Sequence, residues 1–436
     1  MIDQPINRQS LHIGFVSTRF ADTDGVSLET AKWAEVLEGM GHKCYYFSGY
    51  SDRPARRSMV VPEAYYRHPE IQERHDRFFA QSRRSGEDTL WIHHWRGNFR
   101  RHLYRFLHKF KIDALIPENV LAIPLNVPLG LALTEVIAET GIPNIAHHHD
   151  FAWERKRFLV NGIPDYINMA FPPDLPSISH VVINSQAQHQ LARRRGVGSA
   201  IIPNVMNYEE AAPGIDDYSA DLRERLGIAP DELFVLQPTR VVQRKGIEHA
   251  IELVRRLQRP AHLVISHASG DEGDEYEQRV REYAAMLGVP TIFCADIFDD
   301  VRGQTANGQK IYNLWDAYNH ADLVTYPSVF EGFGNAFLEA IYFRKPIVVN
   351  NYSIYSTDIR PKGFRVIEFD EFVTDETVTQ TRAVLEDPVL LAEMVERNYD
   401  LARHHFSYSL LRHKLRVQLE NVFGANGGMN ARPEGF

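Results

Sequence analysis

Two glutamates flank a glycine-bearing loop in the stretch YPSVFEGFGNAFLEAIYFRKPIVVN at 326–350. The pattern predicts a strand, a loop containing Gly332 and Gly334, a helix, and then a second strand. Unpaired N–H groups and the helix dipole make such a loop a site for anions. Glu331 precedes the predicted helix and Glu339 lies inside it. This combination suits a nucleotide sugar: the amides would bind the diphosphate, one carboxylate the ribose diol, and the other carboxylate the sugar.

A basic pair, Arg240 and Lys245, stands between a predicted strand at 233–239 and a helix that begins near 247. Positive charge at the N-terminus of a helix opposes the helix dipole. A phosphate partner therefore explains the pair better than a solvated surface does. Arg244 lies next to the pair, and we expect its side chain to be solvated.

Three consecutive histidines, at 147–149, stand at the end of a predicted strand. The carboxyl edge of a parallel sheet is where open α/β folds bind ligands. Neighbouring residues of a strand point to opposite faces, so we expect no single metal ion to be bound by all three. Arg155 and Arg157 follow at a predicted helix start, which favours an anionic partner, with a carboxylate in the core as the alternative.

These motifs resemble those of the retaining glycosyltransferases of family 4, which have the GT-B fold. Glu331-Gly-Phe-Gly-x4-Glu339 is similar to the E-x7-E signature of that family, and Arg240-x4-Lys245 to its diphosphate-binding pair. The resemblance implies that Glu331 lies along the sugar ring and that Glu339 holds the ribose. It also implies donor contacts from Gly25 at the distal phosphate, from Ile297 or Phe298 at the base, and from the main chain of Phe333, Gly334 and Asn335.

The histidine that this family places against the transferred sugar aligns with His149, which is followed by Asp150. His148 is chemically as suitable. Two departures from the family pattern occur, one in the predicted first domain and one where the chain crosses into the second. Asp24-Gly25-Val26-Ser27 stands where paired glycines are usual, and Val205 replaces a glycine in the crossing turn Ile202-Pro-Asn-Val-Met.

The elements that position these residues alternate between strand and helix along the whole chain, which predicts an α/β fold. Predicted strands lie at 11–16, 43–47, 113–117, 144–147, 181–184 and 200–203, and again at 233–239, 262–266, 291–294, 323–326, 347–349 and 365–369. We expect two Rossmann-like, doubly wound domains that face each other across a cleft, at 1–204 and 205–405. A helix at 406–423 would return to the first domain, and 424–436 would be a disordered tail.

Two segments are harder to interpret. Residues 51–90 show no clear element order, and the role of 51–95 is not assigned. An insertion at 301–310 predicts a hairpin tip from its glycines. The stretch at 96–111 predicts a helix with an apolar stripe and a basic face. The basic face could be solvated, or could bind anionic acceptors or membrane phospholipid. We favour the soluble interpretation.

Composition narrows the class of protein. A chain of 436 residues is too long for one ordinary core, and its net charge of −9 argues against a general nucleic-acid binder. No apolar run reaches the ~20 residues that span a bilayer. The two cysteines, Cys44 and Cys294, are expected as buried free thiols, and no leader is evident, so a cytoplasmic location is expected. Oligomeric state stays open.

The function predicted from these features is metal-independent, retaining transfer of a hexose from GDP-mannose or UDP-glucose. No cofactor is required beyond this nucleotide-sugar co-substrate. The acceptor would be a small anion, such as a glycerate, a phosphoglycerate or glucosylglycerate, bound by Asp150, Arg155 and Arg157, as in the synthesis of a compatible solute. Alternatives are a sugar-nucleotide 2-epimerase, a glycogen-type phosphorylase or synthase, a lipid or polysaccharide glycosyltransferase, and a non-catalytic sugar-nucleotide-binding protein.

Overall fold

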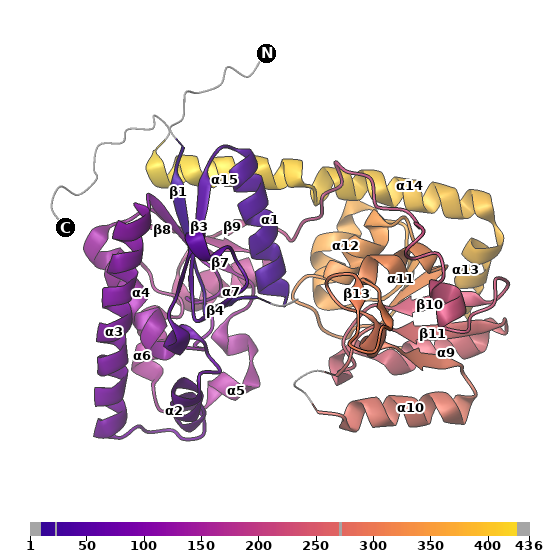
Figure 1. The fold of residues 1–436 in the computed structure, drawn as a ribbon, viewed down its shortest axis with the longest axis horizontal. Coiled ribbons are helices and arrows are strands. Elements are labelled where there is room, and N and C mark those ends of the chain that lie inside the picture. Colours follow the sequence, from indigo (N-terminus) through magenta and orange to yellow (C-terminus); the bar gives the residue numbers. More distant parts are fainter. Residues whose placement is uncertain (1–9, 22–23, 270–272, 425–436) are drawn as a thin grey trace, which may run out of the picture. The chain divides into compact units, whose positions relative to one another are not determined.

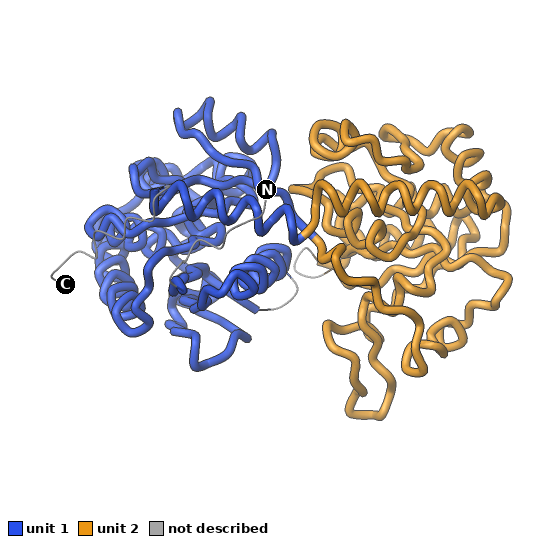
Figure 2. The backbone as a smooth tube through the Cα atoms, turned by 90° about the horizontal axis from the view of Figure 1, so that it is seen from above, with its two compact units in different colours: residues 1–205, 408–436 blue, residues 206–407 orange. Residues whose placement is uncertain are grey.

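The computed structural model describes residues 10–21, 24–269 and 273–424. The predicted disordered tail therefore lies, after Gly424, outside the described residues. The chain divides into two compact units (Figure 2): unit 1 runs to Val205 and resumes at Tyr408, and unit 2 spans Met206–Ser407. Across the described residues, no helix is long and apolar enough to cross a membrane.

Unit 1 is built on a seven-stranded parallel sheet in the order β5-β3-β1-β6-β7-β8-β9. Figure 1 labels β1, β3, β7, β8 and β9 of this sheet. Most residues of its longer strands are buried, as expected for a parallel sheet covered on both faces. The strand order reverses between β1 and β6, and sheets of this kind bind ligands outside the carboxyl ends at such a point. The strands are β1 His12–Val16, β3 Lys43–Ser48, β5 Ser58–Val60, β6 Ala114–Pro117, β7 Asn144–His148, β8 Ile178–Val182 and β9 Ala200–Ile201; a separate parallel pair joins β2 Arg19–Phe20 to β4 Tyr50–Ser51.

The helices of unit 1 are α1 Gly25–Gly39, α2 Pro69–Phe79, α3 Gly86–Phe110, α4 Val127–Thr140, α5 Lys156–Leu159, α6 Pro164–Ala170, α7 Ser185–Arg195 and α15 Tyr408–Phe423. The strand predicted at 181–184 ends earlier, at Val182, because Asn184 caps α7 and its Oδ1 accepts a hydrogen bond from the amide of Ala187 at 2.7 Å. The predicted return helix is α15, whose Leu411, Leu415 and Leu419 pack in the same core cluster as Trp33 of α1.

The predicted basic helix is the second half of α3. Its apolar stripe is buried, including Phe99 and Phe106. Two arginines of its basic face pair with carboxylates of α4: Arg96 with Glu135 at 3.1 Å, and Arg100 with Glu139 at 2.8 Å. Part of the basic face thus helps to hold α3 against α4.

Unit 2 contains a six-stranded parallel sheet in the order β12-β11-β10-β15-β16-β17. The insertion at 301–310 forms the predicted hairpin, because Gly303–Gln304 (β13) and Lys310–Ile311 (β14) pair antiparallel. The strands are β10 Leu233–Gln237, β11 Ala261–Ile265, β12 Thr291–Phe293, β15 Leu323–Tyr326, β16 Ile347–Asn350 and β17 Ile367–Phe369, and the helices are α8 Leu222–Arg225, α9 Ile247–Leu257, α10 Glu275–Leu287, α11 Leu314–His320, α12 Asn335–Tyr342, α13 Asp375–Glu386 and α14 Pro388–His405.

The crossing turn at 202–206 accommodates a valine in place of glycine. Val205 is fully buried, and no positive φ is required there. Its amide donates to Glu29 Oε1 at 3.0 Å, and its carbonyl accepts from Lys32 Nζ at 2.6 Å. Side chains of α1 therefore satisfy both backbone groups of this residue.

Candidate active site

The loop between β15 and α12 requires glycine at position 334. Gly334 has φ 132° and caps α12, and a Cβ there would lie 2.4 Å from the hydroxyl oxygen of Tyr352. Tyr352 in turn donates to the carbonyl of Phe333 at 2.9 Å. This packing holds the backbone of residues 333–335 at the N-terminus of α12, the arrangement that favours anions.

A second loop, between β10 and α9, is hydrogen-bonded to the first. The amide of Val329 donates to the carbonyl of Arg244 at 2.8 Å. Gly246 has φ 58°, and a Cβ on it would lie 2.7 Å from the carbonyl oxygen of Pro327. This close approach brings Lys245 to the loop that bears Glu331.

Glu331 is buried, and its carboxylate is gripped by two cations. Lys245 Nζ contacts Oε1, and Arg244 Nη1 lies 3.2 Å from Oε2. Burial on its own would raise the pKa of Glu331, but the charges of Lys245 and Arg244 outweigh it and hold that pKa below its ordinary value. Burial lowers the pKa of Lys245. The site thus contains a buried, ionised carboxylate with its countercharges.

The expectation that Arg244 is solvated was wrong. Its side chain is 36% exposed, yet it contacts both the carboxylate of Glu331 and the carbonyl of Phe330. The partner lies 87 residues further along the chain. Sequence spacing alone could not have shown this contact.

Arg240, the other predicted cation, is exposed at the end of β10 and forms no ion pair within the described part of the chain. His267 follows β11. Its pKa is lowered to about 4 by burial, and also by the charges of Lys245 and Arg240. The reasoning from sequence missed this histidine, although it stands directly after a predicted strand at the same sheet edge.

Glu339 and Ile297 complete the predicted donor residues of unit 2. Glu339 is half-buried in α12, and its Oε2 accepts a hydrogen bond from the hydroxyl of Tyr318 at 2.8 Å. Ile297 is 7% exposed, and its carbonyl accepts from the amide of Tyr312 at 2.8 Å. The neighbouring Phe298 is half-buried. The role of Ile297 at the base stays a prediction.

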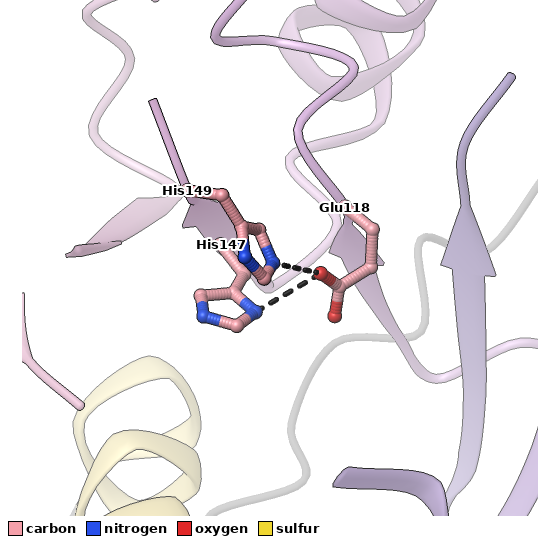
Figure 3. Close-up of side chains that lie close together, drawn as sticks. All are labelled: Glu118, His147 and His149. Atoms are coloured by element: carbon pink, nitrogen blue, oxygen red, sulfur yellow. Dashed lines mark hydrogen bonds and ion pairs between the residues drawn. The ribbon is translucent and has the colours of Figure 1, made fainter. Parts of the chain in front are cut away.

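In unit 1, His147 and His149 converge on one carboxylate (Figure 3). His147 Nδ1 lies 2.9 Å and His149 Nε2 3.3 Å from Glu118 Oε2. His147 lies in β7 and His149 directly follows it, two positions further on, so both side chains point to the same side; Glu118 directly follows the neighbouring β6. The alternation of side chains along a strand argued against one ion bound by all three histidines, but no local pattern indicated that two of them meet this glutamate.

The environment of this cluster is apolar. Burial raises the pKa of Glu118 to about 7, lowers that of His147 to about 3, and lowers that of His149. The indole of Trp33 stacks on His147 with ring centroids 4.0 Å apart. Both histidines are therefore neutral at pH 7. The three ligand atoms lie within 4.8 Å of one another, a donor set that could hold a metal ion such as Zn²⁺.

His148, the alternative to His149, points to the opposite face of β7. Its Nε2 lies 2.9 Å from Nδ1 of His180, and its residue is 1% exposed. The side chain of His149 is 9% exposed. This geometry favours His149 over His148 as a residue that could contact a ligand.

The predicted acceptor residues adjoin His149. Asp150 Oδ1 accepts from Asn119 Nδ2 at 2.8 Å, and its other oxygen contacts Arg155 Nε. Arg157 forms no ion pair within the described residues, and burial together with the charge of Arg155 lowers its pKa. Arg155 thus has a carboxylate partner in the structure, whereas Arg157 is exposed and forms no such pair among the described residues, although the charges of Asp150 and Asp76 act on it.

Gly25 is the exposed first residue of α1. Asp24 caps this helix and accepts from the amides of Val26 at 3.1 Å and Ser27 at 3.3 Å. A carboxylate of the chain itself therefore already binds two amides at the N-terminus of this helix. The predicted contact between Gly25 and the distal phosphate stays a prediction.

Comparison with known proteins identifies relatives along most of the chain. The mannosylglucosylglycerate synthase of Thermotoga maritima is 32% identical over 434 residues, which cover 92% of this chain and 98% of the relative. The enzyme of the same name from Petrotoga mobilis is 33% identical over 383 residues, covering 82% of this chain and 86% of the relative.

Solved structures show the same fold at low sequence identity. A glycosyltransferase from Rickettsia africae has a TM-score of 0.67 at 14% identity and covers 96% of this chain and 100% of its own. Anabaena HepE in complex with UDP-glucose has a TM-score of 0.64 at 13% identity and covers 94% and 100%. Residues 190–415 match a family model described as family 4 glycosyltransferase in conflict systems. The chain therefore belongs to the family 4 glycosyltransferases and has the GT-B fold.

Proposed function

We propose that this chain transfers mannose, with retention of configuration, from a nucleotide sugar to glucosylglycerate or a related small glycerate. Two relatives that are 32% and 33% identical carry the name mannosylglucosylglycerate synthase. The observation that carries the proposal is the buried carboxylate of Glu331, held between Lys245 and Arg244. Its loop leads directly into the N-terminus of α12.

On the donor side, Arg240 and Lys245 neutralise the charge that builds on the leaving diphosphate. Preorganised charges of this kind are commonly the largest contribution to catalysis. Glu331 orients the sugar, Glu339 binds the ribose, and the amides of residues 333–335 meet sugar or phosphate. Lys245 contacts Glu331 in the structure, so a bound diphosphate shares this cation with the carboxylate.

The transferred sugar passes through an oxocarbenium-like state. His149 hydrogen-bonds outer hydroxyls of the sugar, and the leaving phosphate takes the proton from the acceptor hydroxyl. The new bond forms on the face that the phosphate leaves, so the anomeric configuration is retained. No protein nucleophile is assigned in this mechanism.

On the acceptor side, Arg157 is the residue with the strongest case for binding a carboxylate. It is exposed, forms no ion pair within the described residues, and lies close enough to Arg155 for the two charges to repel each other. A carboxylate such as that of a glycerate would offset this repulsion, whereas an uncharged polyol would not. Asp150 and Arg155 pair with each other and would bind hydroxyls or share the same carboxylate.

The test is an assay of the purified chain with GDP-mannose and UDP-glucose against glucosylglycerate, glycerate, phosphoglycerate and glycerol. Transfer to the charged acceptors, with an α-anomeric product by NMR from an α-linked donor, supports the proposal. An EDTA-treated sample tests independence from metal ions. Inversion of configuration contradicts the mechanism. Donor binding without transfer to any acceptor of the panel would favour a non-catalytic sugar-nucleotide-binding protein. Epimerisation of the donor in the absence of acceptor would favour a sugar-nucleotide epimerase.

A further inference from the structure

The dipeptide Glu118-Asn119 directly follows β6 at the edge where the strand order of unit 1 reverses. Both residues are buried, Glu118 at 0% and Asn119 at 6% exposure. Neither belongs to the motifs of the proposed donor or acceptor site. Both nevertheless contact the dipeptide His149-Asp150 on the neighbouring segment.

Glu118 holds two imidazoles with one oxygen. Its Oε2 lies 2.9 Å from His147 Nδ1 and 3.3 Å from His149 Nε2. The pKa of Glu118 is about 7, so at higher pH, such as pH 8, its carboxylate is ionised and can only accept hydrogen bonds, and each of these nitrogens then carries the proton. His149 then presents Nδ1 as an unprotonated acceptor. A tautomer fixed in this way can accept a hydrogen bond from a sugar hydroxyl.

Asn119 holds the backbone of the same segment. Its Oδ1 accepts from the amide of His149 at 3.0 Å and from that of Asp150 at 3.5 Å, and its Nδ2 donates to Asp150 at 2.8 Å. Asn119 adopts φ 58°, a left-handed conformation that is uncommon for residues other than glycine. Such strained positions cluster at functional sites.

A resident metal ion fits this cluster less well. A histidine that binds metal usually donates its other ring N–H to a carboxylate, carbonyl or water. If His147 bound a metal through Nδ1, its proton would lie on Nε2. That nitrogen is buried and has no hydrogen-bond partner in the part of the chain that the structure describes. The hydrogen-bonded arrangement leaves only an unprotonated nitrogen there, which is less costly to bury.

We propose that Glu118 and Asn119 are positioning residues for His149: Glu118 sets its tautomer and ring orientation, and Asn119 sets its backbone. This inference rests on the proposed function, in which His149 contacts the transferred sugar. Neither residue touches substrate in this scheme, and both act through His149.

The test compares Glu118→Gln and Asn119→Gly with the wild type. Glutamine keeps the shape of Glu118 but loses its charge, and glycine adopts φ 58° without strain, so the second variant removes only side-chain hydrogen bonds. The matched control is Gln258→Gly, because Gln258 has φ 54°, is exposed and ends α9 in unit 2.

We expect kcat to fall about 10- to 100-fold in both Glu118→Gln and Asn119→Gly, with the KM for the donor within about twofold of the wild-type value and Tm close to that of the wild type. Nitrogen-15 NMR of the imidazoles at pH 8, with His149 assigned from a His149→Gln variant, should show the Nε2–H tautomer. Glu118→Gln should lose this single tautomer. Gln258→Gly should keep wild-type kcat.

Wild-type kcat in both variants, or an Nδ1–H tautomer of His149 in the wild type, would overturn the inference. A stoichiometric metal ion in the purified protein, detected by elemental mass spectrometry, would also overturn the inference, because the oxygen of Glu118 and the nitrogens of His147 and His149 would then be metal ligands. An inactive wild type that still shows the Nε2–H tautomer refutes the proposed function and supports the role of Glu118.

Discussion

Replacing Lys245 with methionine separates catalysis from folding at the donor site. Lys245 is 7% exposed and contacts the buried carboxylate of Glu331, whose remaining cation, Arg244, lies 3.2 Å away. Removing one partner of a buried pair typically destabilises a protein by about 3–5 kcal/mol because the other charge is left uncompensated. Since Arg244 remains, we expect about 2–3 kcal/mol here.

The double variant Lys245→Met/Glu331→Gln removes the uncompensated charge. We therefore expect it to regain most of the lost free energy of unfolding, measured by denaturant titration. Activity should not recover, because the cation that stabilises the leaving diphosphate is still missing. A fall in kcat/KM on the order of 10²–10³ corresponds to the loss of one preorganised electrostatic group.

Arg244→Gln serves as the matched control. Arg244 is more exposed and its contact with Glu331 is longer, so we expect a fall in kcat/KM of only about tenfold. The reasoning is refuted if Lys245→Met keeps kcat/KM within about threefold of the wild type. It is also refuted if the double variant is as unstable as Lys245→Met alone, since the buried charge would then not be the cause.

Three further outcomes are expected. Gly334→Ala should destabilise unit 2 by about 1–3 kcal/mol in a denaturant titration, because φ is 132° and the new Cβ would lie 2.4 Å from Tyr352 Oη. Gly97 lies in open space within α3, so Gly97→Ala should be neutral or stabilising in the same titration. Donor binding at pH 5.5 should be accompanied by proton uptake, because a diphosphate offsets the cations that help to lower the pKa of His267 to about 4. Calorimetry in two buffers with different ionisation enthalpies should show this uptake, and the uptake should be absent in His267→Asn. The free energy of unfolding should fall as pH drops from 6.5 towards 4, because burial lowers the pKa of His180 to about 4 while the unfolded chain still binds the proton near 6.5. The slope of about 1.4 kcal/mol per pH unit from this residue should be absent in His180→Gln. The same dependence of the free energy of unfolding on pH in the wild type and in His180→Gln would contradict this expectation.

Some elements were poorly predicted because their stability is not local. The short strands β4 and β5 are held by pairing with other strands, β4 with the distant β2 and β5 with β3, rather than by a pattern of their own. The start of α3 did have a local signal. Ser85 and Asp88 form a capping box, with each side chain accepting from the other residue's backbone amide at 3.1 Å, and the spacing Ser-x-x-Asp could have located this N-terminus.

The sequence by itself determined the fold class and most of its elements. Buried parallel strands are continuous apolar runs, and the helices that cover the sheets carry apolar residues at a period near 3.6. Both patterns can therefore be recognised within a short stretch of sequence. The motif residues around Glu331 and the family were recognisable for the same reason, because their types and spacing are local.

Only the tertiary structure decided which side chains meet. Glu118 reaches His149 across two neighbouring strands, and Arg244 reaches Glu331 across two loops 87 residues apart. The pKa values of these groups depend on burial and on charges contributed by other elements. Such contacts follow from strand order and loop packing, which no local pattern encodes.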